Sequence, residues 1–417
     1  PFVNMSSDAE QEFFSDGITE EILNSLASEK SLKVAGRTSS FAFKGQNDDL
    51  RRIGDALGVA HILEGSVRKV GAQVRITAQL IQADNGFHLW SETYDRELTD
   101  VFAIQDEIAN EILKQLRSQL LDDEDLMVVE AKRTNPVVYD LYLRAKQRIY
   151  TRDSAEITKA ISELDKAIRL DPEYAPALAQ RGVATMLMSE FNYGDLADDE
   201  ANRRGKRFVD RALSLDENLA EGLAALGLYY SNQPGGSELA IEPLTKALSI
   251  NPNLIDASNW LFSALQGVRD FKGSLEVIVD VTERDPLYRP AFANAIMQFN
   301  AYGMPEKAEA LLQRIEAFDA SNPDLYTARA VNFMFSGRSG EGLQQMELNR
   351  ELDEMSGVEE NVLSIGLSNT MQFERVIEEG SPFAKPYALY QVGQVDEAIE
   401  LAHAQASSGY PGNLFNL

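Results

Sequence analysis

The chain has 417 residues, a net charge of −27 at pH 7 and a hydrophobic share of 44%. That length exceeds one ordinary core, so we expect two or more structural units. The negative charge repels phosphate backbones and argues against a nucleic-acid partner. Cysteine is absent, which excludes disulfides, thiolate metal sites and cysteine nucleophiles.

The sequence contains no run of 18 apolar residues, so we expect no membrane insertion within it. It opens on Pro1-Phe2-Val3 without an initiator Met or a signal peptide, and we expect it to be part of a longer polypeptide. The sequence does not identify the cellular compartment of the protein. An upstream membrane helix would place the segment in the periplasm, and the lack of one would leave it in the cytoplasm.

Residues 1–121 predict a small α/β domain with a mixed sheet, in the order β-α-β-α-β-β-β-α. Ser15 or Asp16 is positioned to cap the first helix, because Ile18 and Ile22 begin its apolar face. The predicted strands are 1–4, 32–36, 61–69, 73–83 and 87–94, and the later predicted helices are 48–57 and 100–121.

The strand over 73–83 shows the clearest pattern of the domain. Its apolar residues alternate with polar ones, so we expect one buried and one polar face; the apolar set is Val74, Ile76, Ala78 and Leu80. Asp84-Asn85-Gly86 predicts a hairpin turn, since Asn and Gly tolerate positive φ. Trp90 is expected in the core. The closing helix presents one apolar face: Phe102, Ile104, Ile108, Ile112 and Leu116.

Four segments together resemble the TolB-like amino-terminal domain: PFVNMSSDAEQEFFSDGITEEI, VAGRTSSFAFKG, ILEGSVRKVGAQVRITAQLIQADNGFHLWSETYDREL and FAIQDEIA. The resemblance covers almost all of residues 1–120, with small departures such as Gly36 and Gln46. It implies a position between an upstream output domain and downstream tetratricopeptide repeats. The output domain in this family is often a class III adenylate cyclase or a winged-helix regulator.

A polar loop is expected after the second strand. Loops at strand ends hold ligands in α/β folds, and Arg with hydroxyl groups suits a carboxylate or phosphate. The ligand-binding candidates for a small anion are Arg37, Ser39, Ser40 and Lys44. The alternative is a purely structural loop, in which Arg37 pairs with an acid and Phe41 and Phe43 anchor the loop to the core.

A break signal recurs through the rest of the chain: a helix ends, Asp or Asn follows, often with Pro, and another helix begins. It occurs at Leu170-Asp171-Pro172, Leu215-Asp216-Glu217, Ile250-Asn251-Pro252, Arg284-Asp285-Pro286 and Ser321-Asn322-Pro323. The spacing near 34 residues is that of the tetratricopeptide repeat. We expect five or six regular repeats and one or two degraded ones, with an insertion near residues 193–202 and a poor match over 352–384.

Small residues are expected where the two helices of a repeat touch, at Gly182 and Gly227. The sequence therefore predicts an α+β protein in which the α/β domain (1–121) and a linker (122–134) precede an all-α tetratricopeptide-repeat solenoid (135–417). Such a stack buries its apolar residues only against neighbouring repeats.

Solenoids of this type bind extended peptides along the first helix of each repeat. Amide side chains suit main-chain recognition, because each both donates and accepts. The peptide-binding candidates are Asn232, Asp256, Asn259, Ser263, Gln266 and Asn300. We expect Asn259 to bond to a peptide main chain and Asp256 to favour a basic ligand residue. The alternative is a merely solvated face.

No catalytic or cofactor motif stands out. The three histidines, His61, His88 and His403, lack the i,i+4 partner of a metal-binding helix. Gly337 to Gly342 is expected to be a turn between repeat helices. We therefore expect no cofactor, no metal and no enzyme activity in this segment. The hypotheses are a sensory or scaffolding segment with a protein or peptide partner, a small-anion receptor, or the non-catalytic part of an enzyme whose active site lies upstream. A homo-oligomer is also compatible with the sequence.

Overall fold

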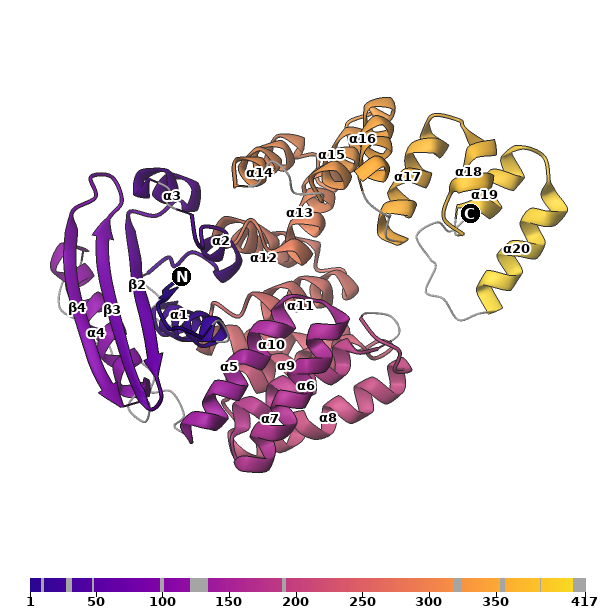
Figure 1. Ribbon diagram of the computed structural model, residues 1–417. Coiled ribbons are helices and arrows are strands. Elements are labelled where there is room, and N and C mark those ends of the chain that lie inside the picture. Colours follow the sequence, from indigo (N-terminus) through magenta and orange to yellow (C-terminus); the bar gives the residue numbers. More distant parts are fainter. Residues whose placement is uncertain are drawn as a thin grey trace. The chain divides into compact units, whose positions relative to one another are not determined.

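The computed structural model describes residues 1–8, 11–27, 32–46, 49–97, 101–120, 134–189, 193–318, 324–352, 357–382 and 384–407 (Figure 1). The chain forms two compact units, Pro1–Tyr288 and Arg289–Leu417. The first unit holds the sheet and the first four helix pairs. The sequence predicts a linker at residues 122–134, of which residues 122–133 lie outside the described part.

A four-stranded mixed sheet forms the amino-terminal part of the first unit, in the order β1-β2-β3-β4. β1 (Val3–Asn4) runs parallel to β2, and the other pairs are antiparallel. The longer strands are β2 (His61–Val70), β3 (Gln73–Gln82) and β4 (His88–Glu97). In β3 the predicted apolar set is buried while Arg75 is exposed, so the predicted alternation is confirmed.

The helices of this part are α1 (Glu12–Ala27), α2 (Arg37–Phe41), α3 (Leu50–Leu57) and α4 (Val101–Leu120). Ile18 and Ile22 of α1 and Ile104, Ile108 and Ile112 of α4 are buried in one core with the apolar residues of β3. Trp90 packs against the same core. The side chains of Phe102 and Leu116 lie outside the described residues. The predicted mixed α/β arrangement is confirmed.

Three local predictions in this domain are wrong. Helix α1 begins at Glu12, so Ser15 is not its cap; the buried Ser15 hydroxyl instead donates to the carbonyl of Phe2 at 2.9 Å. Residues 32–36 form no strand, because their backbone bonds to other elements go to helices: Gly36 N–H donates to Arg284 O at 2.7 Å, and Gly36 O accepts from Ser40 N at 3.0 Å. The loop expected after that strand is the short helix α2.

Described residues from 134 onward form sixteen helices and no strand of a sheet; a single bridge joins Ser189 and Leu196. The pairs of the first unit are α5 (Pro136–Tyr150) with α6 (Ser154–Leu170), α7 (Ala175–Leu187) with α8 (Asp198–Leu215), α9 (Ala220–Ser231) with α10 (Ser237–Ile250), and α11 (Ile255–Gly267) with α12 (Phe271–Arg284).

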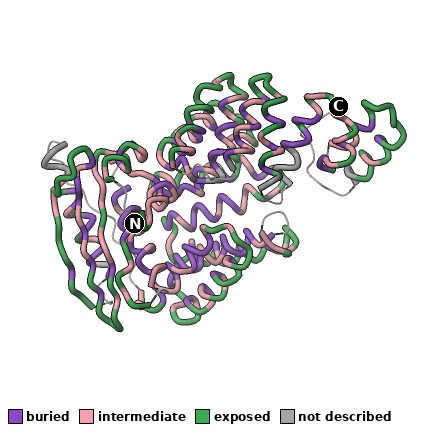
Figure 2. The backbone as a smooth tube through the Cα atoms, turned by 45° about the horizontal axis from the view of Figure 1, so that its top comes forward, coloured by how far each residue is buried: buried purple, intermediate pink, exposed green. Residues whose placement is uncertain are grey.

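The second unit continues with α13 (Arg289–Ala301) and α14 (Pro305–Phe318), α15 (Asp324–Phe335) and α16 (Ser339–Leu352), α17 (Gly357–Asn369) and α18 (Phe373–Glu379), and α19 (Lys385–Gln391) and α20 (Val395–Ser407). The signal Ser321-Asn322-Pro323 lies outside the described residues. Gly337 takes φ 74° in the turn between α15 and α16, but Gly340 and Gly342 lie within α16, so the turn predicted over 337–342 ends before Ser339. In Figure 2 the buried positions concentrate on the helices, whereas much of the outer strands is exposed or intermediate.

The pairs have the close contacts of tetratricopeptide repeats. A Cβ at Gly182 would lie 2.7 Å from Val209 Cγ2, so α7 and α8 meet there. A Cβ at Gly227 would lie 2.3 Å from Leu244 Cγ, between α9 and α10. Both predicted small-residue contacts are confirmed, and the solenoid is of tetratricopeptide type.

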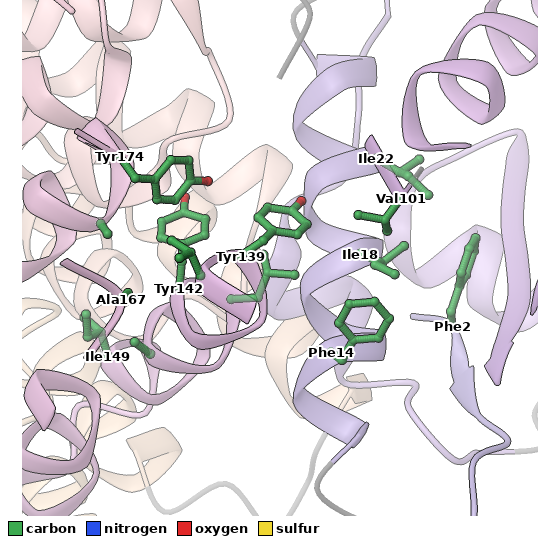
Figure 3. Packing of buried hydrophobic residues seen from close by; sticks show 14 of the residues in the cluster. Phe2, Phe14, Ile18, Ile22, Val101, Tyr139, Tyr142, Ile149, Ala167 and Tyr174 are labelled. Atoms are coloured by element: carbon green, nitrogen blue, oxygen red, sulfur yellow. The ribbon is translucent and has the colours of Figure 1, made fainter. Parts of the chain in front are cut away.

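One core extends from the sheet into helices α5 to α9 of the first unit, and Figure 3 shows part of it. Phe2 and Ile18 belong to the α/β part, and Tyr139, Tyr142 and Tyr174 continue the cluster into the helix pairs. Tyr139 and Tyr142 stack at 6.2 Å, and Tyr142 meets Tyr174 edge-on at 5.5 Å. The α/β part and the first repeats therefore share buried apolar surface.

Gly227→Ala should destabilise the first unit by about 1–3 kcal/mol, because the added methyl overlaps Leu244. Leu244→Ala alone should cost about 2–5 kcal/mol through its cavity. The double variant should cost less than the sum, since the new methyl occupies vacated space. Urea denaturation of the three variants measures this. Gly340→Ala, where a Cβ meets nothing within 4 Å, is the control. Additive losses would mean that the two helices do not meet at Gly227.

Candidate binding sites

The residues of the predicted anion site lie on α2 and the turn after it. Arg37 bonds to Glu20 at 3.1 Å and lies over the rings of Phe41 and Tyr150 at 4.4 and 4.5 Å. Lys44 pairs with Glu12 and Asp16, each at 2.5 Å. Ser40 lies in α2 and donates its N–H to Gly36 O at 3.0 Å. The two cations are thus already neutralised by carboxylates of α1.

The carboxylate that binds at the start of α2 is the side chain of Asp285, from the same chain. Asp285, at the end of α12, accepts from Thr38 N at 3.0 Å, Ser39 N at 2.7 Å and Ser39 Oγ at 2.6 Å. Burial raises the pKa of Asp285, and the bonds from Ser39 and Thr38 act in the opposite direction. A Cβ at Gly36 would lie 2.2 Å from Asp285 Cβ, so this approach requires the glycine.

A second set of charges joins α1 to α5. Glu20 accepts from Lys146 at 2.9 Å, Gln147 at 2.6 Å, Tyr150 at 3.2 Å and Arg37 at 3.1 Å. Lys146 is only 2% exposed and also pairs with Glu21 at 3.1 Å. Burial lowers the pKa of Lys146, but Glu20 and Glu21 outweigh it and hold that pKa well above its ordinary value.

The sequence analysis missed this network and the role of Asp285. Lys146 falls on the buried face of α5 with Tyr142, Leu143 and Ile149, and a cation on an apolar stripe is a usable signal for a buried ion pair. Asp285 gives no such signal, because it ends a repeat in the same way as Asp171 and Asp216 do.

The peptide-binding candidates on α11 differ in what they contact. Asp256 pairs with Arg152 and accepts from the Tyr288 hydroxyl. Arg152 takes φ 56° in the turn after α5, which few non-glycine residues adopt. The Gln266 amide donates to Ser274 Oγ at 2.8 Å, and the exposed Ser263 donates to Asn259 O at 3.2 Å. The basic residue expected opposite Asp256 is therefore Arg152 of the chain itself.

Two candidates lie elsewhere. Asn232 follows α9 and donates to Asn202 of α8 at 2.8 Å. Asn300 belongs to the second unit and donates to Ile296 O at 2.8 Å. Within the first unit, the space among α5, α7, α9 and α11 is only about 30 Å³, with Tyr150, Asp256 and Trp260 among its lining. That volume holds a few waters at most and no peptide.

The described residues contain no group of three or more His, Cys, Asp or Glu side chains that could hold a metal. None of the described helices is long and apolar enough to cross a bilayer. His61 and His88 lie on β2 and β4, and His403 lies on α20. The clustered charges in the first unit are paired with each other, which is an arrangement for holding elements together.

These features define the class of the chain: an α/β domain joined to a tetratricopeptide-type solenoid. No protein-family model matches it. A curated protein of Rhizobium meliloti (strain 1021), named "Putative adenylate cyclase 3", is 36% identical over 233 residues, which are 55% of this chain and 39% of that protein. The chain thus spans about two fifths of the length of the curated relative it matches.

Solved structures with repeats are also similar. A tetratricopeptide repeat protein from Parabacteroides merdae ATCC 43184 has a TM-score of 0.42 at 14% identity, covering 64% of this chain and 98% of its own. The Cut9–Hcn1 hetero-tetramer of APC/C has a TM-score of 0.49 at 11% identity, with 74% and 57% covered. With TM-scores this low, the assignment of repeats rests on the helix pairs described above.

Asp285→Ala should destabilise the first unit by about 1–3 kcal/mol, because it leaves the buried Ser39 donors without an acceptor. The amides of Thr38 and Ser39 should lose protection from hydrogen exchange. The matched control is Asp216→Ala, at the same repeat position, where the carboxylate accepts only locally from Asn218 N at 3.1 Å. Equal losses of stability in the two variants would mean that Asp285 acts only as the residue that caps the end of α12.

Lys146→Met should cost about 3–5 kcal/mol near pH 7, because Glu21 loses its ion pair and the buried Glu20 keeps Arg37 as its one cation. In the wild type, burial would raise the pKa of Glu20, but Lys146 and Arg37 lower it. Without the lysine the pKa of Glu20 is lowered less, so the variant loses less stability than the wild type as pH falls. The difference in unfolding free energy between the wild type and the variant should therefore shrink towards about pH 5. Urea denaturation at several pH values can measure it. Lys166→Met, at an exposed site on α6, should show neither effect.

Proposed function

We propose that this chain is a non-catalytic regulatory segment of a longer adenylate cyclase and that its solenoid binds a protein or peptide partner. The observation that carries the proposal is the 36% identity over 233 residues to the Rhizobium protein. A match of that length cannot lie within residues 1–121 alone, so it includes repeat helices. The winged-helix output that the sequence resemblance also allows has no such support.

The charge pairs of the first unit support a role in transmission over one in chemistry. Glu20, Lys146 and Asp285 are buried and hydrogen-bonded to residues of this chain. A free base or nucleophile would need an open face towards a substrate. The same contacts hold α1 to α5 and α2 to α12, so a partner on the repeats would act on the α/β domain through a packed unit.

The small-anion receptor is the weaker candidate. An anion at Arg37, Ser39, Ser40 or Lys44 would have to displace Glu20, Asp285, or the carboxylates that hold Lys44. A peptide on Asn259, Ser263 and Gln266 requires no broken ion pair, although Gln266 would give up its bond to Ser274. We therefore keep the α11 residues as the proposed contacts on that helix.

The test compares this chain with the complete product of its gene. In a bacterial strain that lacks adenylate cyclase, the chain alone should produce no cyclic AMP, because the catalytic groups belong to the remainder. The complete product should produce it, and Lys146→Met in the complete product should change that activity. Cyclic AMP from the chain alone would overturn the non-catalytic assignment. None from the complete product, shown to be soluble, would overturn the cyclase assignment.

A further inference from the structure

An open groove of about 650 Å³ lies on the outer side of the first unit, where α6, α7 and α8 meet. α6 contributes Thr158, Ile161 and Ile168, and α8 contributes Phe208 and three arginines. α7 supplies Leu178 and Arg181. The groove belongs to the first two helix pairs and is distinct from the α11 residues discussed above.

The floor of the groove is apolar. Ile161, Ile168 and Met188 are only half-buried, although they pack against the main core of the unit. Phe208 is likewise half-buried and packs on the smaller cluster around Leu178. These side chains leave a strip of apolar surface that solvent reaches, and such strips favour a partner that covers them.

The groove is also positively charged, in a chain whose net charge is −27. Four arginines line it: Arg181, Arg204, Arg207 and Arg211. Arg181 is held by Asp165 at 2.8 Å and lies 4.8 Å over the ring of Phe208. Arg211 donates to Pro172 O at 3.0 Å, which leaves its charge unpaired there.

Arg207 is the residue best placed to receive a ligand. It is exposed on α8, and no other described residue gives it an ion pair or a hydrogen bond. Arg204 is exposed too but pairs with Glu200. A guanidinium beside apolar surface suits a carboxylate that is itself carried on an apolar segment.

The insertion between α7 and α8 helps to shape this groove. Residues 188–197 separate these helices, earlier than the insertion predicted over 193–202, because residues 198–202 belong to α8. Only residues 151–153 separate α5 from α6. Met188 and Leu196, at the two ends of the insertion, both line the groove. The groove is thus a particular feature of the second helix pair, which the regular repeat does not supply.

We infer that this groove binds an acidic amphipathic peptide segment of a partner protein, with its apolar side on Ile161, Ile168 and Phe208 and its carboxylates on Arg207 and Arg211. The inference rests on the proposed function as a protein-binding segment and names the surface and the partner's chemistry. The groove is open, and a small molecule would bury too little of its surface there. A helix lying between two helices buries one apolar face and keeps its acids at the rim.

The probe is a fluorescein-labelled peptide of about 14 residues, with Leu and Phe at helical spacing and Asp and Glu elsewhere. Fluorescence anisotropy of the complete chain should show binding that weakens as salt is added. Arg207→Glu should weaken binding about fivefold or more, because an attraction becomes a repulsion. A peptide with the same apolar positions and Lys in place of the acids should not bind.

The matched control is Arg203→Glu. It makes the same charge change on the same helix, at a residue that is exposed and outside the groove lining. Binding should stay within about twofold of the wild type. Equal weakening by the two variants, or equal affinity for acidic and basic peptides, would overturn the inference.

The wild type and the Arg207→Glu variant also test two other possible occupants of the groove. Flotation with phosphatidylglycerol vesicles, abolished by Arg207→Glu, would overturn the peptide in favour of a lipid surface. Self-association in sedimentation, lost in Arg207→Glu, would assign the groove to a second copy of this acidic chain. If the peptide binds but the complete product makes no cyclic AMP, only the proposed cyclase function is wrong. If the complete product makes cyclic AMP but the peptide does not bind, only the proposed peptide site in the groove is wrong.

Discussion

The first unit depends on one buried ion pair, between Lys146 of α5 and Glu20 of α1. Four donors from two parts of the chain converge on the Glu20 carboxylate, and Lys146 has almost no contact with solvent. Burying these charges costs desolvation energy that only good pairing offsets. The contact therefore fixes how α1 lies on α5, because any other placement would leave a charge buried and unpaired.

The buried Asp285 carboxylate makes a second contact with the α/β domain, at the other end of the first unit's helix pairs. Glu20 holds α1 to the first repeat helix, and Asp285 holds α2 to the end of the fourth pair. The two contacts span four helix pairs, so the α/β domain is tied to both ends of this part of the solenoid. A solenoid alone transmits force only between neighbouring repeats. The added contacts join the α/β domain to both ends of these helix pairs, which supports the regulatory role proposed for this chain.

The two surfaces proposed to bind a peptide differ in how far their charges are already paired within the chain. The pocket among α5, α7, α9 and α11 has a volume of only about 30 Å³, and Arg152 pairs with Asp256 where a basic ligand residue was expected. The groove of α6, α7 and α8 keeps solvent-accessible apolar residues and Arg207, which has no ion pair with another described residue. The pairing of Asp256 with Arg152 supports the groove of α6, α7 and α8 as the proposed recognition surface.

The sequence by itself determined the local pattern: the alternation in β3, the helix pairs near a 34-residue period, and the small-residue contacts at Gly182 and Gly227. These depend on side-chain periodicity and on turn residues, which are properties of neighbouring positions. Only the tertiary structure decided that residues 32–36 pair with no strand, that Arg37 and Lys44 are neutralised, and that Asp285 binds α2. Those outcomes join residues up to 250 positions apart, as Lys33 and Glu283 do, and no local pattern records which distant carboxylate a cation or an amide will meet.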